Sequence, residues 1–369
     1  MNDRWIAERM NSIEVSGVRR VFDLARSLKN PVNLSIGQPH FDVPEPIKSA
    51  AKAAIDAEKN GYTASQGIAE LVHRLQSDVD AKYRPADRKV MVTNGTGGGL
   101  LLALMCTVNP GDEVIIFDPY FVMYPHLITL CGGKTVVVDT QPSFEIDLNR
   151  VADAMTPRTK AIVVNSPSNP SGVVIAPHVL RDLAELAAKR GVLLISDEIY
   201  HAFSYDAPFH SPAEFHPDVL VVDGFGKTYG VTGWRMGFAH GPRRLIEEMT
   251  KLQQFTFVCA PSICQYGTLA ALDFDVSGIT ADYRRKRDRL CNGLRGRYEF
   301  NMPGGAFYLY PKAPGGSGTA FVDEAIRNNL LIIPGKTFSR HDSHFRVSYA
   351  ASDETIDRGI EILCRIAGS

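Results

Sequence analysis

The feature that most constrains the fold is an alternation, between residues 89 and 223, of short β-branched runs with longer amphipathic stretches. Two short runs, residues 161–164 (AIVV) and 192–196 (VLLIS), are apolar at consecutive positions. Such strands are typical of a mostly parallel sheet with helices on both sides. We therefore predict an α/β fold with a three-layer large domain. The predicted strands are Lys89–Thr93, Glu113–Phe117, Lys134–Val138, Lys160–Val164, Val192–Ser196 and Val219–Asp223, and the predicted helices between them are Gly97–Val108, Phe121–Cys131, Asp147–Met155 and Pro177–Arg190.

The pattern changes after residue 242. Two long amphipathic stretches, residues 243–273 and 278–297, predict helices. They are followed by predicted strands at Phe307–Tyr310, Leu330–Ile333 and Phe345–Tyr349, a helix over residues 319–329 and a final helix that begins near Asp353 after a capping Ser352. We therefore predict a smaller α+β domain over residues 276–369, which follows a large domain over residues 43–275.

Charge and composition exclude several classes of function. The chain has 369 residues, and its 40 Lys and Arg residues against 41 Asp and Glu residues leave a formal net charge of -1. Nucleic-acid-binding and polybasic membrane-surface proteins carry excess positive charge, so we expect neither nucleic acid nor membrane as a partner. We also expect no secretory signal, and the longest apolar stretch, about residues 100–108, is too short to span a membrane. The six cysteines form no CxxC pair, which argues against a metal site or disulfide framework and favours a cytoplasmic location.

A nucleotide-binding loop is one alternative reading of the GKT sequence at residues 226–228. A P-loop requires a glycine five residues before its second glycine, and Val221 occupies that position. The nearby turn NGTGGGLL, residues 94–101, lacks a complete dinucleotide fingerprint because Leu100 stands where a small residue is needed. This turn nevertheless predicts a helix N-terminus that can bind an anion such as phosphate.

Polar residues follow the predicted carboxyl ends of four strands, where α/β folds bind their ligands. These residues are Gly95, Thr96 and Gly97 in the turn, Asn169, Asp197 with Tyr200, and Lys227 with Arg235. Together they suit a phosphate, a cationic ring nitrogen, a phenolic oxygen and an aldehyde that forms an imine with lysine. Those are the features of pyridoxal phosphate, which we predict as the cofactor.

The chain resembles the class I/II aminotransferases, which are fold type I pyridoxal-phosphate-dependent enzymes. The resemblance runs over nearly the whole chain through SIGQPHFDVP, YTASQGIAEL, VTNGTGGGL, DPYFVMYP, NSPSNPSG, SDEIY, GKTYGVTGWRMGF, PGGAFYLYP, LLIIPGKTF and FRVSYA. It implies a transaminase that moves an amino group from an L-amino acid to a 2-oxo acid, with 2-oxoglutarate as the expected acceptor. A β- or γ-lyase or a synthase of the same fold is the alternative. The resemblance also implies that residues 1–42 form an arm that packs with the small domain.

The resemblance assigns roles around the cofactor ring. Lys227 matches the lysine that forms the imine and then moves a proton, and Asp197 matches the acid that faces the pyridine nitrogen. Tyr200 and Asn169 match residues that hydrogen-bond the phenolic oxygen, and Phe121 matches the aromatic residue that stacks on the ring. The phosphate-binding residues that it implies are Gly95, Thr96, Gly97 and Arg235.

Three further matches concern the substrate and a second subunit. Arg346 matches the arginine that binds the substrate α-carboxylate, where a two-pronged contact requires Arg rather than Lys. Gly37 matches a glycine whose backbone approaches the substrate, and Asn169 also belongs to this site. Tyr62 matches a tyrosine that reaches the phosphate in the neighbouring subunit, so the resemblance implies a homodimer with shared active sites.

The sequence departs from the family at two positions. Hydroxyl residues commonly stand one and three positions before the lysine, whereas this chain has Gly226 and Gly224 there. We therefore expect the phosphate to depend more on Arg235 and on the helix-opening turn.

Overall fold

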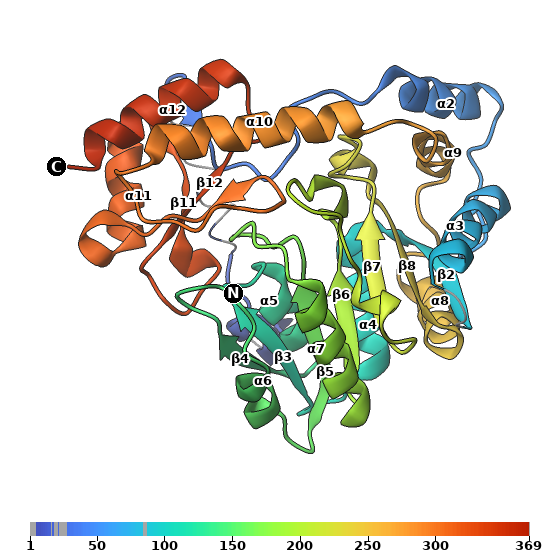
Figure 1. The fold of residues 1–369 in the computed structure, drawn as a ribbon. Helices are drawn as coiled ribbons and strands as arrows, with labels where there is room; N and C mark the ends of the chain where they lie inside the picture. Colours follow the sequence, from blue (N-terminus) through green and yellow to red (C-terminus); the bar gives the residue numbers. More distant parts are fainter. Residues whose placement is uncertain (1–4, 16, 18–20, 22–27, 84–86, 369) are drawn as a thin grey trace.

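The structure is a computed structural model that describes residues 5–15, 17, 21, 28–83 and 87–368 (Figure 1). Its centre is a seven-stranded sheet with the strand order β2-β8-β7-β6-β5-β3-β4. The strands are β2 (Arg88–Asn94), β3 (Glu113–Asp118), β4 (Lys134–Asp139), β5 (Thr159–Asn165), β6 (Leu193–Asp197), β7 (Leu220–Gly224) and β8 (Met236–Pro242). Neighbouring strands are parallel except at β8, which runs antiparallel to β2 and β7. The six predicted strands and the mostly parallel sheet are confirmed.

The sequence pattern does not predict strand β8. Its sequence, MGFAHGP, contains two glycines and a proline and has no β-branched residue. The strand nevertheless pairs along its whole length with β2, from Asn94 opposite Met236 to Arg88 opposite Pro242. This register brings Arg235, the residue before β8, next to the turn that follows β2.

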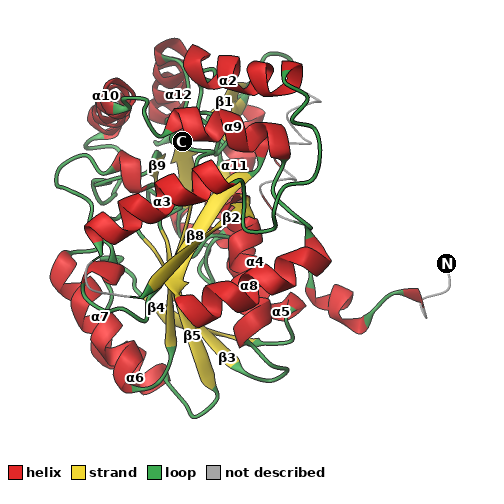
Figure 2. Cartoon of the chain, turned by 90° about the vertical axis from the view of Figure 1, so that its right-hand side faces the viewer, coloured by secondary structure: helices red, strands yellow, loops and turns green. Residues whose placement is uncertain are grey.

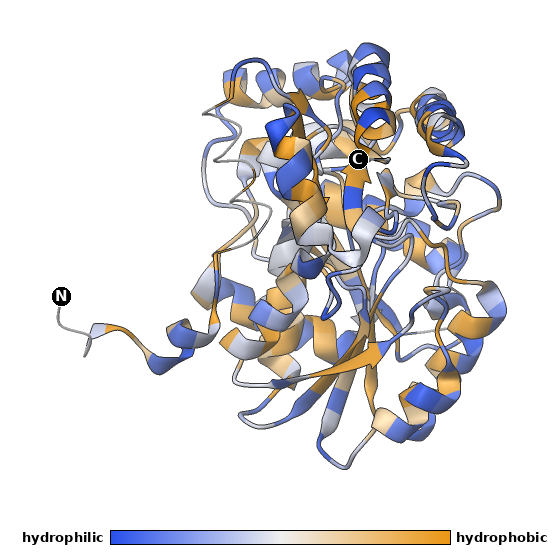
Figure 3. Ribbon diagram, turned by 90° about the vertical axis from the view of Figure 1, so that its left-hand side faces the viewer, coloured by the Kyte–Doolittle hydropathy of each residue, from blue (hydrophilic) through white to orange (hydrophobic). Residues whose placement is uncertain are grey.

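Helices cover both faces of the sheet (Figure 2). One face packs against α6 (Leu148–Ala154) and α7 (Pro177–Lys189). The other packs against α4 (Gly95–Thr107), α5 (Met123–Leu130) and α8 (Arg243–Thr256). Consecutive residues of β3 alternate between these two cores, and Figure 3 shows that the central strands are mostly hydrophobic. This arrangement confirms the three predicted layers.

The helix predicted over residues 243–273 is wrong, because the structure contains two helices there. Helix α8 ends at Thr256, and α9 (Ser262–Ala271) begins after Pro261. Between them Val258 has a left-handed φ of 67°, and a proline disfavours helical geometry at the residue before it. The sequence pattern also does not predict α2 (Glu45–Asp56), which packs on α9, or α3 (Ala69–Lys82).

The C-terminal part forms the smaller α+β unit. A three-stranded antiparallel sheet of β9 (Tyr308–Leu309), β11 (Ile333–Pro334) and β12 (Phe345–Ser348) packs with α10 (Ser277–Leu294), α11 (Gly318–Arg327) and α12 (Asp353–Ile366). The predicted strand at residues 330–333 is split into β10 (Leu330–Leu331) and β11. The Ser352 hydroxyl accepts a hydrogen bond from the backbone N–H of Thr355 at 3.2 Å, which confirms the predicted cap of α12.

The N-terminal segment lies against this smaller unit from residue 32 onwards. Strand β1 (Val32–Asn33) pairs in parallel with β10. The first described residues extend outward (Figures 2 and 3), whereas Ile13 and Glu14 line a cavity next to the sheet. The domain boundaries after residues 42 and 275 stay a prediction. Within the described part of the chain, no helix has the length and apolar character needed to cross a membrane.

Candidate active site

A cavity of about 530 Å³ opens where the carboxyl ends of the parallel strands meet the smaller unit. It brings together residues that are far apart in the sequence. The cavity is lined by most of the predicted site residues: Gly37, Gly95, Thr96, Gly97, Phe121, Asn169, Asp197, Tyr200, Lys227, Arg235 and Arg346. Only Tyr62 of the predicted set lies elsewhere within the described chain, with 88 % of its surface exposed at a separate cavity.

Lys227 lies in the loop after β7, and its amine faces the N-terminal segment. The amine donates a hydrogen bond to the Gly37 carbonyl at 2.5 Å. Burial and the charges of Arg346 and Arg235 lower the pKa of Lys227 to about 8. At pH 7 about a tenth of the amine is then neutral, against less than a thousandth at the ordinary pKa of about 10.4. The site therefore prepares this amine for nucleophilic and proton-transfer chemistry.

Asp197, the last residue of β6, is a buried carboxylate. Burial raises its pKa to about 6, and a hydrogen bond from the Tyr124 hydroxyl to Oδ2, at 2.7 Å, opposes that rise. The backbone N–H of Ile199 donates to Oδ1 at 3.3 Å. The carboxylate is thus mostly ionised at pH 7 and needs a cationic partner in the cavity. The sequence pattern does not single out Tyr124, whose only signal is its position at the start of α5, three residues after Phe121.

Arg346 projects from β12 as a buried guanidinium, 2 % exposed. Its Nη1 donates to Asn169 Oδ1 at 2.9 Å, and its Nη2 donates to the Ser35 carbonyl at 2.8 Å. Its Nε has no hydrogen-bond partner among the described residues. Arg346 also lies over the Tyr308 ring at 4.5 Å. Among the described residues Arg346 has no carboxylate partner, and such a buried cation is suited to bind an anionic ligand.

Tyr200 and Asn169 lie side by side at the floor of the cavity. The Asn169 amide donates to the Tyr200 hydroxyl at 3.5 Å, and that hydroxyl lies 2.9 Å from the hydroxyl of Tyr308. The Phe121 ring meets the Tyr124 ring edge to face, with centroids 5.7 Å apart. Tyr308 was expected only as part of a strand, and its contact with Tyr200 makes it part of the site.

An anion-binding cradle lies where β2 turns into α4. Gly95 has a left-handed φ of 69°, which favours glycine, and a Cβ there would lie 2.8 Å from the Arg235 guanidinium. Arg235 itself has a φ of 54° and donates to the Thr232 carbonyl at 3.1 Å. The buried Thr96 hydroxyl has no hydrogen-bond partner among the described residues. A helix N-terminus, a guanidinium and a free hydroxyl together fit a phosphate group.

The two glycines before Lys227 differ in the space around them. A Cβ at Gly224 would lie 2.7 Å from the Thr96 hydroxyl, so a larger residue there would collide with the cradle. A Cβ at Gly226 would have ordinary contacts, the nearest being 3.4 Å from Thr232 Cα. A hydroxyl side chain therefore fits at Gly226 but not at Gly224.

The nucleotide-loop alternative loses its support in the structure. The residues after GKT form turns and the short 3-10 helix η5 (Thr232–Trp234), so GKT does not open an α-helix that could bind phosphate. The described residues also contain no group of three or more His, Cys, Asp or Glu side chains that could hold a metal ion.

Comparisons with known proteins agree with this site. The family model "Aminotransferase class I and II" matches residues 29–363. The chain is 36% identical to a probable aspartate aminotransferase of Methanocaldococcus jannaschii, over 98% of this chain and 99% of that protein. It is 34% identical to the aspartate/prephenate aminotransferase of Thermus thermophilus, over 99% of both.

The fold is also similar to that of solved aminotransferase structures. The aspartate aminotransferase of Thermus thermophilus with maleate superposes with a TM-score of 0.93 at 34% identity, covering 98% of this chain and 99% of that one. The aspartate aminotransferase of Thermotoga maritima superposes with a TM-score of 0.94 at 30% identity, covering 99% and 100%. The chain is therefore a transaminase and belongs to the class I and II aminotransferase family.

Proposed function

We propose that the chain uses pyridoxal phosphate to transfer the amino group of an L-amino acid to a 2-oxo acid, with 2-oxoglutarate as acceptor. The observation that carries this proposal is the combination, in one cavity, of a lysine with a pKa of about 8, a buried aspartate and a helix N-terminus beside Arg235. Each group matches a different part of the cofactor, and the unpartnered Thr96 hydroxyl supports the fit.

The cavity lining supplies a residue for each part of the cofactor. Asp197 would face the pyridine nitrogen and keep it protonated, and Tyr200 with Asn169 would hydrogen-bond the phenolic oxygen. Phe121 would stack on the ring. The phosphate would bind to Gly95, Thr96, Gly97 and Arg235. When bound, the cofactor supplies an electron sink that weakens the Cα–H bond of the amino acid.

The chain's own residues would then bind the substrate and move the proton. Arg346 would bind the α-carboxylate with its two-pronged guanidinium, helped by the Asn169 amide and the backbone at Gly37. Lys227 Nζ would take the proton from the substrate Cα, because its lowered pKa leaves part of the amine neutral near pH 7. The largely apolar lining of the cavity would strengthen these electrostatic contacts.

A homodimer with shared active sites is part of the proposal. Tyr62 is 88 % exposed in the single chain, as are Phe255 at 82 % and Trp5 at 79 %. The segment of Phe255 touches that of Tyr62, since the Gln253 amide hydrogen-bonds the Ser65 carbonyl. Exposed aromatic side chains on adjacent segments are typical of an interface, so a second copy would cover them and receive Tyr62 at its phosphate. The six free cysteines support the cytoplasm as the location.

A half-reaction screen tests the proposed function. Purified holoenzyme is mixed with single L-amino acids, and the loss of the visible absorbance of the imine-bound cofactor is followed with the formation of the 2-oxo acid. We expect donors to discharge this absorbance and 2-oxoglutarate to restore it. Lys227→Ala should abolish both phases, whereas the matched surface variant Lys89→Ala should not. Steady release of ammonia together with a 2-oxo acid from the donor alone, with no 2-oxoglutarate consumed, would instead identify a lyase.

A further inference from the structure

The segment of residues 34–41, which we name the strap, touches both cations that the proposed reaction uses. The Ser35 carbonyl accepts from Arg346 Nη2 at 2.8 Å, and the Gly37 carbonyl accepts from Lys227 Nζ at 2.5 Å. The strap begins directly after β1, and the Leu34 carbonyl accepts from the backbone N–H of Ser348 on β12 at 2.7 Å. The carbonyls of Ser35 and Gly37 therefore fix the hydrogen bonds of the two cationic side chains.

The outer end of the strap is fixed to helix α10 through one hydroxyl. The Tyr283 hydroxyl accepts a hydrogen bond from the backbone N–H of His40 at 3.2 Å and lies 3.1 Å from His40 Nδ1. Burial and the Lys286 charge lower the pKa of His40, so at pH 7 the ring is mostly neutral and Nδ1 can accept the hydroxyl hydrogen. One phenol therefore holds His40 at two points.

The residues around this contact are held firmly. Tyr283 is fully buried, and its ring packs against those of His40 and Phe41 with centroids 5.5 and 6.1 Å away. A Cβ at Gly230 would lie 3.1 Å from the Phe41 ring, so Phe41 packs directly on the loop that follows Lys227. The strap is therefore clamped between α10 and the lysine loop.

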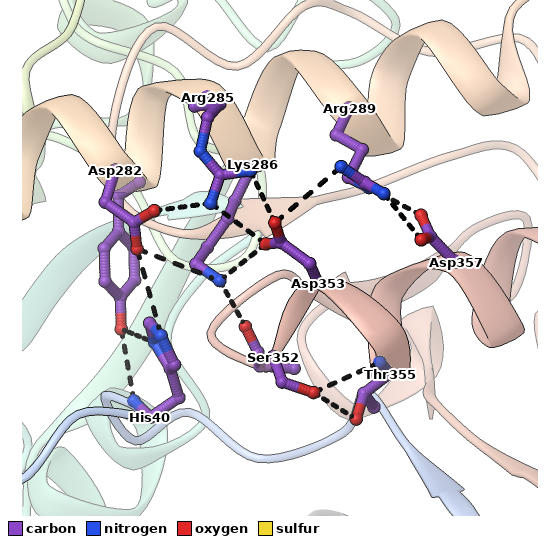
Figure 4. A network of polar contacts seen from close by, with 11 residues as sticks. His40, Asp282, Arg285, Lys286, Arg289, Ser352, Asp353, Thr355 and Asp357 are labelled. Carbon is purple, nitrogen blue, oxygen red and sulfur yellow. Dashed lines mark hydrogen bonds and ion pairs between the residues drawn. The ribbon is translucent and has the colours of Figure 1, made fainter.

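Helix α10 is itself locked to α12 by charged side chains (Figure 4). The buried Lys286 amine donates to the Ala351 carbonyl at 2.8 Å and to Asp353 at 3.0 Å, and Arg285 also pairs with Asp353 at 2.7 Å. Asp282, one residue before Tyr283, lies 3.8 Å from His40 Nε2. Tyr283 thus projects from a fixed support toward a segment without regular secondary structure.

We propose that His40 and Tyr283 are positioning residues of the transamination. They hold the strap so that the Ser35 and Gly37 carbonyls orient Arg346 and Lys227 for the substrate. Neither side chain lines the cavity, so both act through the backbone of the strap. This inference rests on the proposed function, because it needs the roles proposed there for Arg346 and Lys227.

The test compares His40→Ala, Tyr283→Phe and the double variant with Tyr298→Phe. Tyr298 is a matched control, since its buried hydroxyl donates to the Leu363 carbonyl of α12 at 2.7 Å, away from the strap. Two quantities are measured: amide hydrogen exchange of residues 34–41 in the cofactor-free chain, and kcat and KM of the holoenzyme for its best donor. Exchange reports anchoring of the strap without any catalysis.

We expect exchange of the strap to accelerate about tenfold in each strap variant, and kcat/KM to fall about three- to tenfold, as loss of one or two neutral hydrogen bonds implies. The double variant should lose no more than the worse single variant, because the two residues act as one contact. The control should match wild type in both measurements.

Three results would overturn the proposal. Unchanged exchange in both single variants would show that the contact does not anchor the strap. Faster exchange with unchanged kcat/KM would show that the strap does not position the site. An equal fall in kcat/KM and an equal rise in strap exchange in Tyr298→Phe would show a general loss of stability instead. A wild-type holoenzyme that transfers no amino group would instead refute the proposed function, and with it the positioning role, while the exchange data would still report the anchoring.

Discussion

Removing the Tyr124 hydroxyl should disconnect Asp197 from the donor that keeps it ionised. That hydroxyl lies 2.7 Å from Oδ2, and burial already raises the pKa of Asp197 to about 6. A hydrogen bond to a charged group contributes about 1.5–3 kcal/mol. At 1.36 kcal/mol per pKa unit, Tyr124→Phe should raise the pKa of this carboxyl by about one to two units, to about 7–8.

The consequence is a pH dependence with a defined sign. Only the ionised carboxylate attracts a protonated pyridine ring, so affinity for the ring is present above the pKa of Asp197 and is lost as the pH falls through it. In wild type this loss should occur below about pH 6. In Tyr124→Phe it should occur about one to two pH units higher, so the variant should bind most weakly relative to wild type near pH 7.

The assay measures the dissociation constant of pyridoxamine phosphate, which forms no imine with lysine, between pH 5.5 and 8.5. Tyr298→Phe serves as control because its hydroxyl binds the Leu363 carbonyl instead. The two affinity curves should converge toward about pH 8.5, where the carboxyl is mostly ionised in both proteins. A Tyr124→Phe curve that coincides with that of wild type, or one displaced by the same factor at every pH, would refute this reasoning.

Three further predictions follow from the same geometry. Arg346→Lys should lower kcat/KM by about ten- to hundredfold, because a point charge replaces a two-pronged contact; an unchanged kcat/KM for the best donor would remove this residue from the site. Gly226→Ser should tighten cofactor binding by a few-fold or more without loss of stability, whereas Gly224→Ser should destabilise the chain by about 1–3 kcal/mol through overpacking; thermal unfolding and cofactor titration of both variants decide this. Mixing Lys227→Ala with Tyr62→Ala subunits should give activity above either parent, and no recovery after verified subunit exchange would argue against shared sites.

Much of the sheet could be predicted because strands buried on both faces have apolar residues at consecutive positions. Strand β5 carries consecutive apolar residues, Ala161–Val164, that pack alternately into the two cores. Strand β8 carries no such pattern, because glycine, histidine and proline interrupt its core residues Met236 and Ala239, although it pairs with both β2 and β7. The break between α8 and α9 depends on a left-handed Val258, a conformation that no periodicity reveals.

Some residues of the candidate site could also be predicted from the sequence, and others could not. Residues at strand ends, such as Asp197 and Lys227, could be predicted because topology alone brings strand ends together. Tyr124 could not, since its hydrogen bond to Asp197 joins residues 73 positions apart and depends on the direction of α5. The contact between the strap and α10 joins residues even farther apart in the sequence, because His40 and Tyr283 are 243 positions apart. The match of Tyr62 to a cross-subunit tyrosine stays a prediction, because only a second chain can complete that contact.

The most direct measurement of the central claim is to identify where the cofactor attaches. The purified chain is incubated with pyridoxal phosphate, reduced with borohydride to make any imine permanent, digested, and analysed by mass spectrometry. We expect a single stoichiometric adduct on Lys227, because burial and the neighbouring arginines lower the pKa of this amine to about 8 beside the phosphate-binding turn. A principal adduct on any other lysine, or none at Lys227, would contradict it.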